Sequence, residues 1–101
     1  MDNAQILNLD PVVHAPIRLA ILSALIAVES AKFSFLKEAT GASDGNLSTH
    51  LTKLEKSGYI KISKSFENKK PLTSCSMTKK GSDAFEKYLG QLEAIVKMRK
   101  G

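Results

Sequence analysis

Apolar residues recur at steps of three and four in three stretches of the chain, and they alternate with polar residues in a fourth. The first helical pattern covers residues 17–28 and starts after the break that Pro16 introduces. The second covers residues 44–56 and the third residues 84–96. These spacings predict amphipathic helices that each pack one face against a core.

The polar residues between these stretches mark where helices begin and end. Ser43 and Thr78 stand where a side-chain oxygen would cap the helix that follows, and Gly58 stands where the second helix must stop. A short helix over residues 35–41, capped by Ser34, is predicted just before the second. The last helix is expected to run to about residue 98.

The alternating stretch predicts a β-hairpin. Residues 59–66 place Ile60 and Ile62 on one face and polar residues on the other, which is the pattern of a half-buried strand. Residues 67–71 are typical of a turn, and residues 72–77 form the returning strand. The hairpin has lysines at its tip.

The order of these elements predicts the fold class. A helix, a short helix, a tight turn, an exposed helix, a basic hairpin and a long final helix make a mainly α (α+β) winged helix-turn-helix. We expect one domain over residues 1–101, with the winged core at 10–80 and helical dimerisation elements at 1–9 and 81–98.

The second helix has an unusual outer surface. Its three leucines share one side of a helical wheel and should pack inward, while short hydrogen-bonding side chains face outward. Such groups can reach base edges or phosphates in a major groove, and the free N–H groups of the helix start favour a phosphate. The predicted DNA contacts here are Ser43, Gly45, Asn46, Ser48, Thr49, His50 and Lys53.

The positive charge is concentrated in one segment. Residues 53–80 hold eight lysines against two glutamates, whereas residues 1–52 hold three basic against five acidic residues. A basic segment that contains the hairpin favours a polyanionic partner such as DNA. The predicted backbone contacts of the hairpin are Lys64, Asn68, Lys69 and Lys70.

The last helix carries more apolar surface than a winged-helix core can cover. Its stripe at steps of four, three and four is the seam of a two-helix contact, which predicts a homodimer; the alternative is that the helix folds back on its own chain. The predicted interface residues are Ile6, Leu7, Leu9, Phe85, Leu89, Leu92, Ile95 and Val96.

The sequence offers little for catalysis or metal binding. Ser48, His50 and Asp44 lie on one predicted helix without an oxyanion loop, so we expect no enzyme and no cofactor. The single cysteine, Cys75, cannot form an internal disulfide or a CxxC metal site and is expected to be a half-buried strand residue. The apolar run 19–28 is too short to span a bilayer, so we expect a cytoplasmic protein with no membrane partner.

Several motifs carry a resemblance to a known family. The stretches "HAPIRLAIL", "GNLSTHLTKLEKSGYI", "FENKKPLT" and "MTKKG" closely resemble the small MarR/ArsR-like winged-helix transcriptional regulators. The match covers about residues 10–92. It implies a recognition helix at 44–56, a wing at 64–73 and homodimerisation through the terminal helices. Two recognition helices related by a two-fold axis should then read a pseudo-palindromic double-stranded DNA operator. The cysteine-bearing motif of the ArsR metal sensors is missing here, which argues against metal sensing.

Two other functions remain open from the sequence. One is a winged-helix module that binds protein, although its wing would more often be apolar or acidic than lysine-rich. The other is a sensor in which an unknown small-molecule effector or a metal controls DNA release, for which the sequence identifies no pocket.

Overall fold

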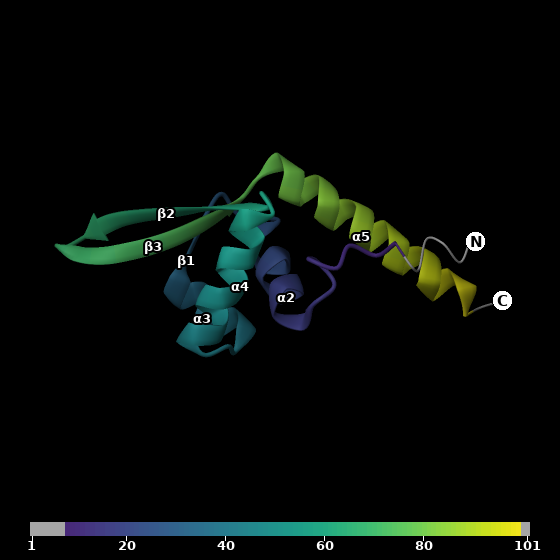
Figure 1. Cartoon of the computed structure of the whole chain (residues 1–101), viewed down its shortest axis with the longest axis horizontal. Helices are drawn as coiled ribbons and strands as arrows, with labels where there is room; N and C mark the ends of the chain where they lie inside the picture. Colours follow the sequence, from purple (N-terminus) through teal and green to yellow (C-terminus); the bar gives the residue numbers. More distant parts are fainter. Residues whose placement is uncertain (1–7, 100–101) are drawn as a thin grey trace.

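A computed structural model describes residues 8–99 of the chain. Three helices form a compact body under a three-stranded antiparallel sheet of order β1-β3-β2, and a long helix leaves the body on the side away from the hairpin (Figure 1). This arrangement confirms the winged-helix fold. The elements are α2 (Pro16–Leu25), β1 (Ala31–Lys32), α3 (Phe33–Thr40), α4 (Asp44–Lys56), β2 (Ile60–Glu67), β3 (Lys70–Met77) and α5 (Lys79–Met98).

The core receives side chains from every element. The predicted stripe of α4 lies in it, since all three of its leucines are buried. Two turns of α5 close the core from above, and the base of the hairpin closes its side. The largest contributors are Ile21, Leu22, Leu25, Leu36, Leu47, Leu51, Leu54, Ile60, Phe85 and Tyr88.

Helix ends follow the sequence closely, with one exception. The Ser43 hydroxyl accepts the Asn46 N–H at 3.2 Å, and the Thr78 hydroxyl accepts the Gly81 N–H at 3.0 Å, so both predicted caps are confirmed. The expected cap at Ser34 is wrong, because α3 starts at Phe33, two residues before the predicted start, and no side chain caps it. The preceding strand β1 already sets the direction of the chain there.

The segment before α2 is a turn held by an aspartate. The Asp10 carboxylate accepts the Val12 N–H at 2.8 Å, and the Asp10 carbonyl accepts the His14 N–H at 2.8 Å. Pro16 then occupies the first position of α2, as its missing N–H allows. The helix ends at Leu25, earlier than predicted, and Val28 is 45% exposed in the loop that follows.

The hairpin is longer than its sequence pattern indicated. β2 and β3 pair from Ile60 with Met77 to Glu67 with Lys70, which leaves only Asn68 and Lys69 as the turn. Both turn residues have positive φ, 53° and 65°, the geometry of a tight hairpin turn that glycine usually occupies. The outer half of the hairpin extends beyond the helices, as Figure 1 shows.

A search of the helices for a membrane-spanning segment finds none of sufficient length and hydropathy within residues 8–99.

Candidate nucleic-acid interface

The outer face of α4 is the first part of the candidate site. The side chains predicted to contact bases, on Asn46, Ser48 and Thr49, are all exposed. The Thr49 hydroxyl donates to the Gly45 carbonyl at 2.9 Å, whereas the side-chain amide of Asn46 and the Ser48 hydroxyl have no hydrogen-bond partner within residues 8–99. Both groups are therefore available to a ligand. Lys53 lies on the same exposed face one turn further on.

Side chains at the start of α4 already make contacts within the chain. The Ser43 oxygen accepts the helix-capping hydrogen bond, which leaves its O–H able to donate to a phosphate. Asp44 forms an ion pair with Lys37 of α3 at 2.7 Å. The carboxylate stands in the first turn, where the helix dipole favours it. The pair with Lys37 also offsets the repulsion that it would exert on a nearby phosphate.

His50 is held by a contact that the sequence did not reveal. Its Nδ1 lies 3.0 Å from Nη1 of Arg18, whose Nε donates to the Val12 carbonyl at 2.6 Å and whose Nη2 donates to the Pro11 carbonyl at 3.3 Å. Arginine can only donate, so Nδ1 must accept in this contact and the ring proton is on Nε2. That N–H is the group that His50 can offer to a phosphate. Arg18 thus ties the segment before α2 to α4.

The hairpin supplies the second part of the candidate site. Lys64, Asn68, Lys69 and Lys70 are all exposed. Lys64 and Thr73 from the hairpin and Ser48 and Thr52 from α4 line one hollow, so the structure brings Lys64 next to the outer face of α4. Lys70 lies opposite Glu67 at the tip, on the other face of the ribbon.

A positive φ at Lys69 is informative because lysine is not the residue that this geometry favours. Left-handed backbone costs a residue with a Cβ roughly 1 kcal/mol relative to glycine. The chain keeps a cation at the tip in spite of this cost. Strain of this kind is often found at functional positions.

Two features of the wing were missed by the sequence analysis. Phe66 is 77% exposed, although it continues the face on which Ile60 is buried. Glu67 forms an ion pair with Lys32 of β1 at 3.2 Å, which ties the tip of the wing to β1. The exposure of Phe66 could have been inferred from Lys64, which lies on the same face between Ile62 and Phe66. A lysine there shows that this face leaves the core before the strand ends.

The predicted dimer residues fall into two groups. Phe85 is only 3% exposed and belongs to the core of its own chain, so it has no surface to offer a second copy. Leu9 is half-buried against the same core, and Ile6 and Leu7 lie outside the described residues. Beyond Phe85, the stripe of α5 opens to solvent: Leu89, Leu92 and Ile95 are half-buried and Val96 is 51% exposed.

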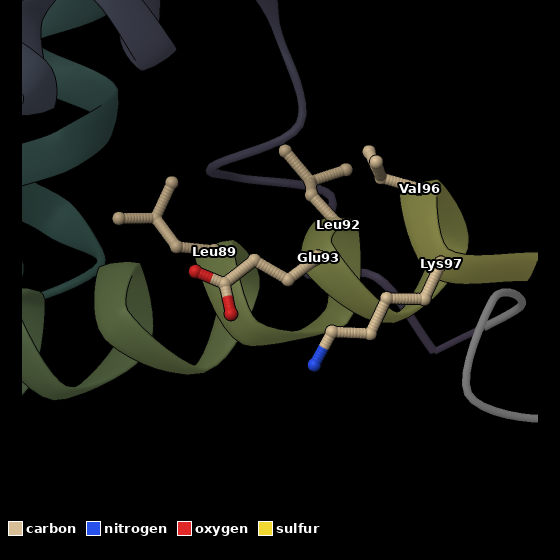
Figure 2. A pocket seen from close by; sticks show the side chains of 5 residues that line it. All are labelled: Leu89, Leu92, Glu93, Val96 and Lys97. Atoms are coloured by element: carbon tan, nitrogen blue, oxygen red, sulfur yellow. The ribbon is translucent and has the colours of Figure 1, made fainter.

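The open part of α5 borders a shallow apolar hollow of about 480 Å³. Leu89, Leu92 and Val96 project to the same side of the helix, and Glu93 and Lys97 flank them (Figure 2). Figure 1 shows that α5 extends here past the helical body, with the chain segment before α2 running beside it. The hollow lies far from the wing.

Comparisons with known proteins agree with this geometry. The chain is 34% identical to the uncharacterized protein MJ0432 of Methanocaldococcus jannaschii over 84 residues, which is 83% of this chain and 91% of that protein. It is similar to the structure of a transcriptional regulator homologue from Pyrococcus horikoshii OT3, with a TM-score of 0.86, 25% identity and coverage of 93% and 95% of the two chains. An ArsR family transcriptional regulator shares the fold, with a TM-score of 0.57, 20% identity and coverage of 96% and 95%.

These findings confirm the resemblance to MarR/ArsR-like regulators. A model of the winged helix DNA-binding domain matches residues 17–96, which include α4, both strands of the wing and most of α5. The chain therefore belongs to the winged helix DNA-binding domain family.

Proposed function

We propose that this protein binds double-stranded DNA as a homodimer and regulates transcription, with α4 in the major groove and the wing on the neighbouring backbone and minor groove. The observation that carries the proposal is the outer face of α4. Its leucines are almost completely buried, while the side-chain amide of Asn46 and the Ser48 hydroxyl point outward without partners in the described chain. A helix with such a face fits a groove about 12 Å wide.

The charges support different roles for the two parts of the site. Lys53, Lys64, Lys69 and Lys70 are exposed and supply affinity for any duplex by displacing counterions from phosphates. Asn46, Ser48 and Thr49 supply sequence preference, because amide and hydroxyl groups can match the donors and acceptors of base edges.

The hollow on α5 supports a second copy of the chain as the partner. An interface around a two-fold axis must be self-complementary. The apolar centre formed by Leu89, Leu92 and Val96 meets this requirement, and the flanking Glu93 and Lys97 carry opposite charges that can pair across the axis. A homodimer of this kind places two α4 helices on successive major grooves of a pseudo-palindrome, roughly 34 Å apart.

A rival function is a protein-binding module of the same fold. The wing argues against it: its exposed tip carries lysines, one of them kept in a strained backbone conformation. A surface for an ordinary protein partner would be less cationic at its centre.

The proposal is tested by selecting duplexes from a randomised library and measuring affinity at several salt concentrations. We expect Lys69→Ala with Lys70→Ala to weaken binding to every duplex and to flatten the slope of log K against log salt by up to about two units. Asn46→Ala should instead reduce discrimination between the selected duplex and a scrambled one.

The matched control is Lys79→Ala with Lys87→Ala, which removes the same charge from α5. This variant should keep the wild-type slope. Absence of any retarded duplex with the wild-type protein, even at low salt, would rule out DNA binding and favour the protein-binding module.

A further inference from the structure

Phe66 is an exposed aromatic side chain in a cationic setting. It is 77% exposed, the most of any large apolar residue in the described chain, and it sits two positions after Lys64 and three before Lys69. Single exposed apolar residues are common on protein surfaces, so exposure alone says little. The face of the hairpin on which Phe66 lies determines what its side chain can contact.

The strand register determines that face. Side chains of a strand alternate between its faces, so Phe66 shares a face with Lys64, Ile62 and Ile60. Directly opposed residues of antiparallel strands also share a face, which adds Pro71 opposite Phe66 and Thr73 opposite Lys64. Phe66 and Pro71 thus make an apolar step near the tip.

This face of the hairpin is turned toward α4. Ile62, Lys64 and Thr73 line one hollow together with Ser48, Leu51 and Thr52 of α4. Ser48 belongs to the surface proposed to contact DNA. The space in front of the face is therefore continuous with the space that a duplex on α4 would occupy.

The distance along the strand carries Phe66 beyond the helix. Phe66 lies four positions after Ile62, or about 13 Å along the strand at a rise of roughly 3.3 Å per residue. This is on the order of the 12 Å width of the major groove. With α4 in the major groove, as proposed above, a ribbon of this length would pass the phosphate backbone and bring Phe66 to the adjacent minor groove.

We propose that Phe66 is a specificity-determining residue that packs its phenyl ring into the minor groove beside each half-site, against the deoxyribose walls, while Lys64 and Lys69 hold the phosphates on either side. The inference rests on the proposed DNA binding and adds a sequence preference to it. The guanine amino group projects from the floor of the minor groove, so the ring is best accommodated at A·T pairs.

The test moves the ring from one face of the ribbon to the other. The double variant Phe66→Ser with Ser65→Phe keeps composition and charge and places the phenyl ring opposite Leu72, on the face away from α4. Wild-type and variant proteins are each used to select duplexes from a randomised library. Affinity for the wild-type selection is then measured against salt, and hydroxyl-radical footprints record which deoxyriboses are covered.

We expect the variant to bind the wild-type duplex roughly tenfold more weakly, because the apolar contact is lost. The slope against salt should not change, since no charge is removed. The preference for A·T pairs at the flanks and the protection of their deoxyriboses should disappear. A loss in slope, or unchanged affinity and flanks in a variant that still folds, would overturn the inference.

These outcomes are distinguishable from failure of the proposed function. If the wild-type protein binds no duplex, DNA binding itself is refuted. If the wild-type protein binds DNA and the variant binds equally well, only the role of Phe66 is refuted. Flotation with anionic lipid vesicles serves as a further arm: an effect of the variant on vesicle binding, with DNA binding unaltered, would assign this surface to a membrane and overturn the inference.

Discussion

Tyr59, which follows α4, connects this helix to the turn before α2. Its hydroxyl donates a hydrogen bond to the Asp10 carboxylate, which also accepts the Val12 N–H. Burial and the neighbouring Asp10 carboxylate together raise the pKa of Tyr59 from 10.0 to about 12, with burial the larger cause. The phenol therefore keeps its proton in the folded protein at pH values where a free tyrosine has lost it.

The sign of the pH effect follows from this shift. A pKa that is higher in the folded state favours the protonated form there, so the stabilisation is complete below pH 10 and is lost as the pH rises toward 12. We expect Tyr59→Phe to lower the free energy of unfolding by about 1 kcal/mol at neutral pH. The difference between the two proteins should shrink between pH 10 and pH 12. Urea unfolding at a series of pH values measures it, and a constant difference across the range would contradict the prediction.

Contacts of this kind could not be predicted from the sequence. Tyr59 and Asp10 are 49 positions apart, Arg18 and His50 are 32 apart, and His14, whose Nδ1 lies 2.6 Å from the Tyr88 hydroxyl, is 74 positions from it. Local periodicity contains no information about which polar side chains meet across the fold. The cap at Ser43 was predictable because donor and acceptor are three positions apart.

At the scale of elements, α5 depends on one close approach. A Cβ at Gly81 would lie 2.1 Å from the Tyr59 carbonyl oxygen, which also accepts the Thr78 N–H at 3.1 Å. The first turn of α5 therefore passes directly over the backbone at the start of the wing. Only a residue without a side chain permits this contact.

Two glycines in α5 give a matched pair of variants. Gly81→Ala should lower the free energy of unfolding by about 3 kcal/mol or more, because backbone atoms must move to make room. Gly90→Ala, where a Cβ would meet nothing within 4 Å, should raise it by about 0.5 to 1 kcal/mol through better helix propensity. Thermal or chemical unfolding distinguishes the two. Equal effects in both variants would show that the close contact is not a constraint.

Most of the elements were predictable from periodicity and caps. The residues at which each element begins and ends show why. α4 was predicted at its observed bounds because a cap, a leucine stripe and a terminal glycine agree. β1 was missed because two residues carry no periodicity. The hairpin was drawn too short because its outer part leaves the core, and alternation between buried and exposed positions then disappears.

At the scale of the molecule, the wing and α5 project from opposite sides of the helical body (Figure 1). The surface proposed to bind DNA therefore lies on one side of the body and the apolar hollow of α5 on the other. We expect Val96→Glu to abolish the proposed dimer, because a carboxylate would have to be buried in an apolar seam. Sedimentation should then give a monomer, and the protected DNA should shrink to a half-site.

The control for this variant is Val28→Glu, which makes the same substitution at a valine that is 45% exposed in the loop after α2. It should leave the oligomeric state unchanged. A monomeric wild-type protein would refute the dimer without bearing on the contacts of α4.

The anchoring of α5 at Gly81 makes this helix a lever arm. A helix of 20 residues is about 30 Å long, so a tilt of about 5° at its fixed end displaces the far end by roughly 3 Å. In the proposed dimer, that displacement would alter the gap between the two recognition helices rather than the bases that each one prefers. Substitutions near Gly81 would thus allow related proteins to bind operators that have the same half-sites at a different spacing.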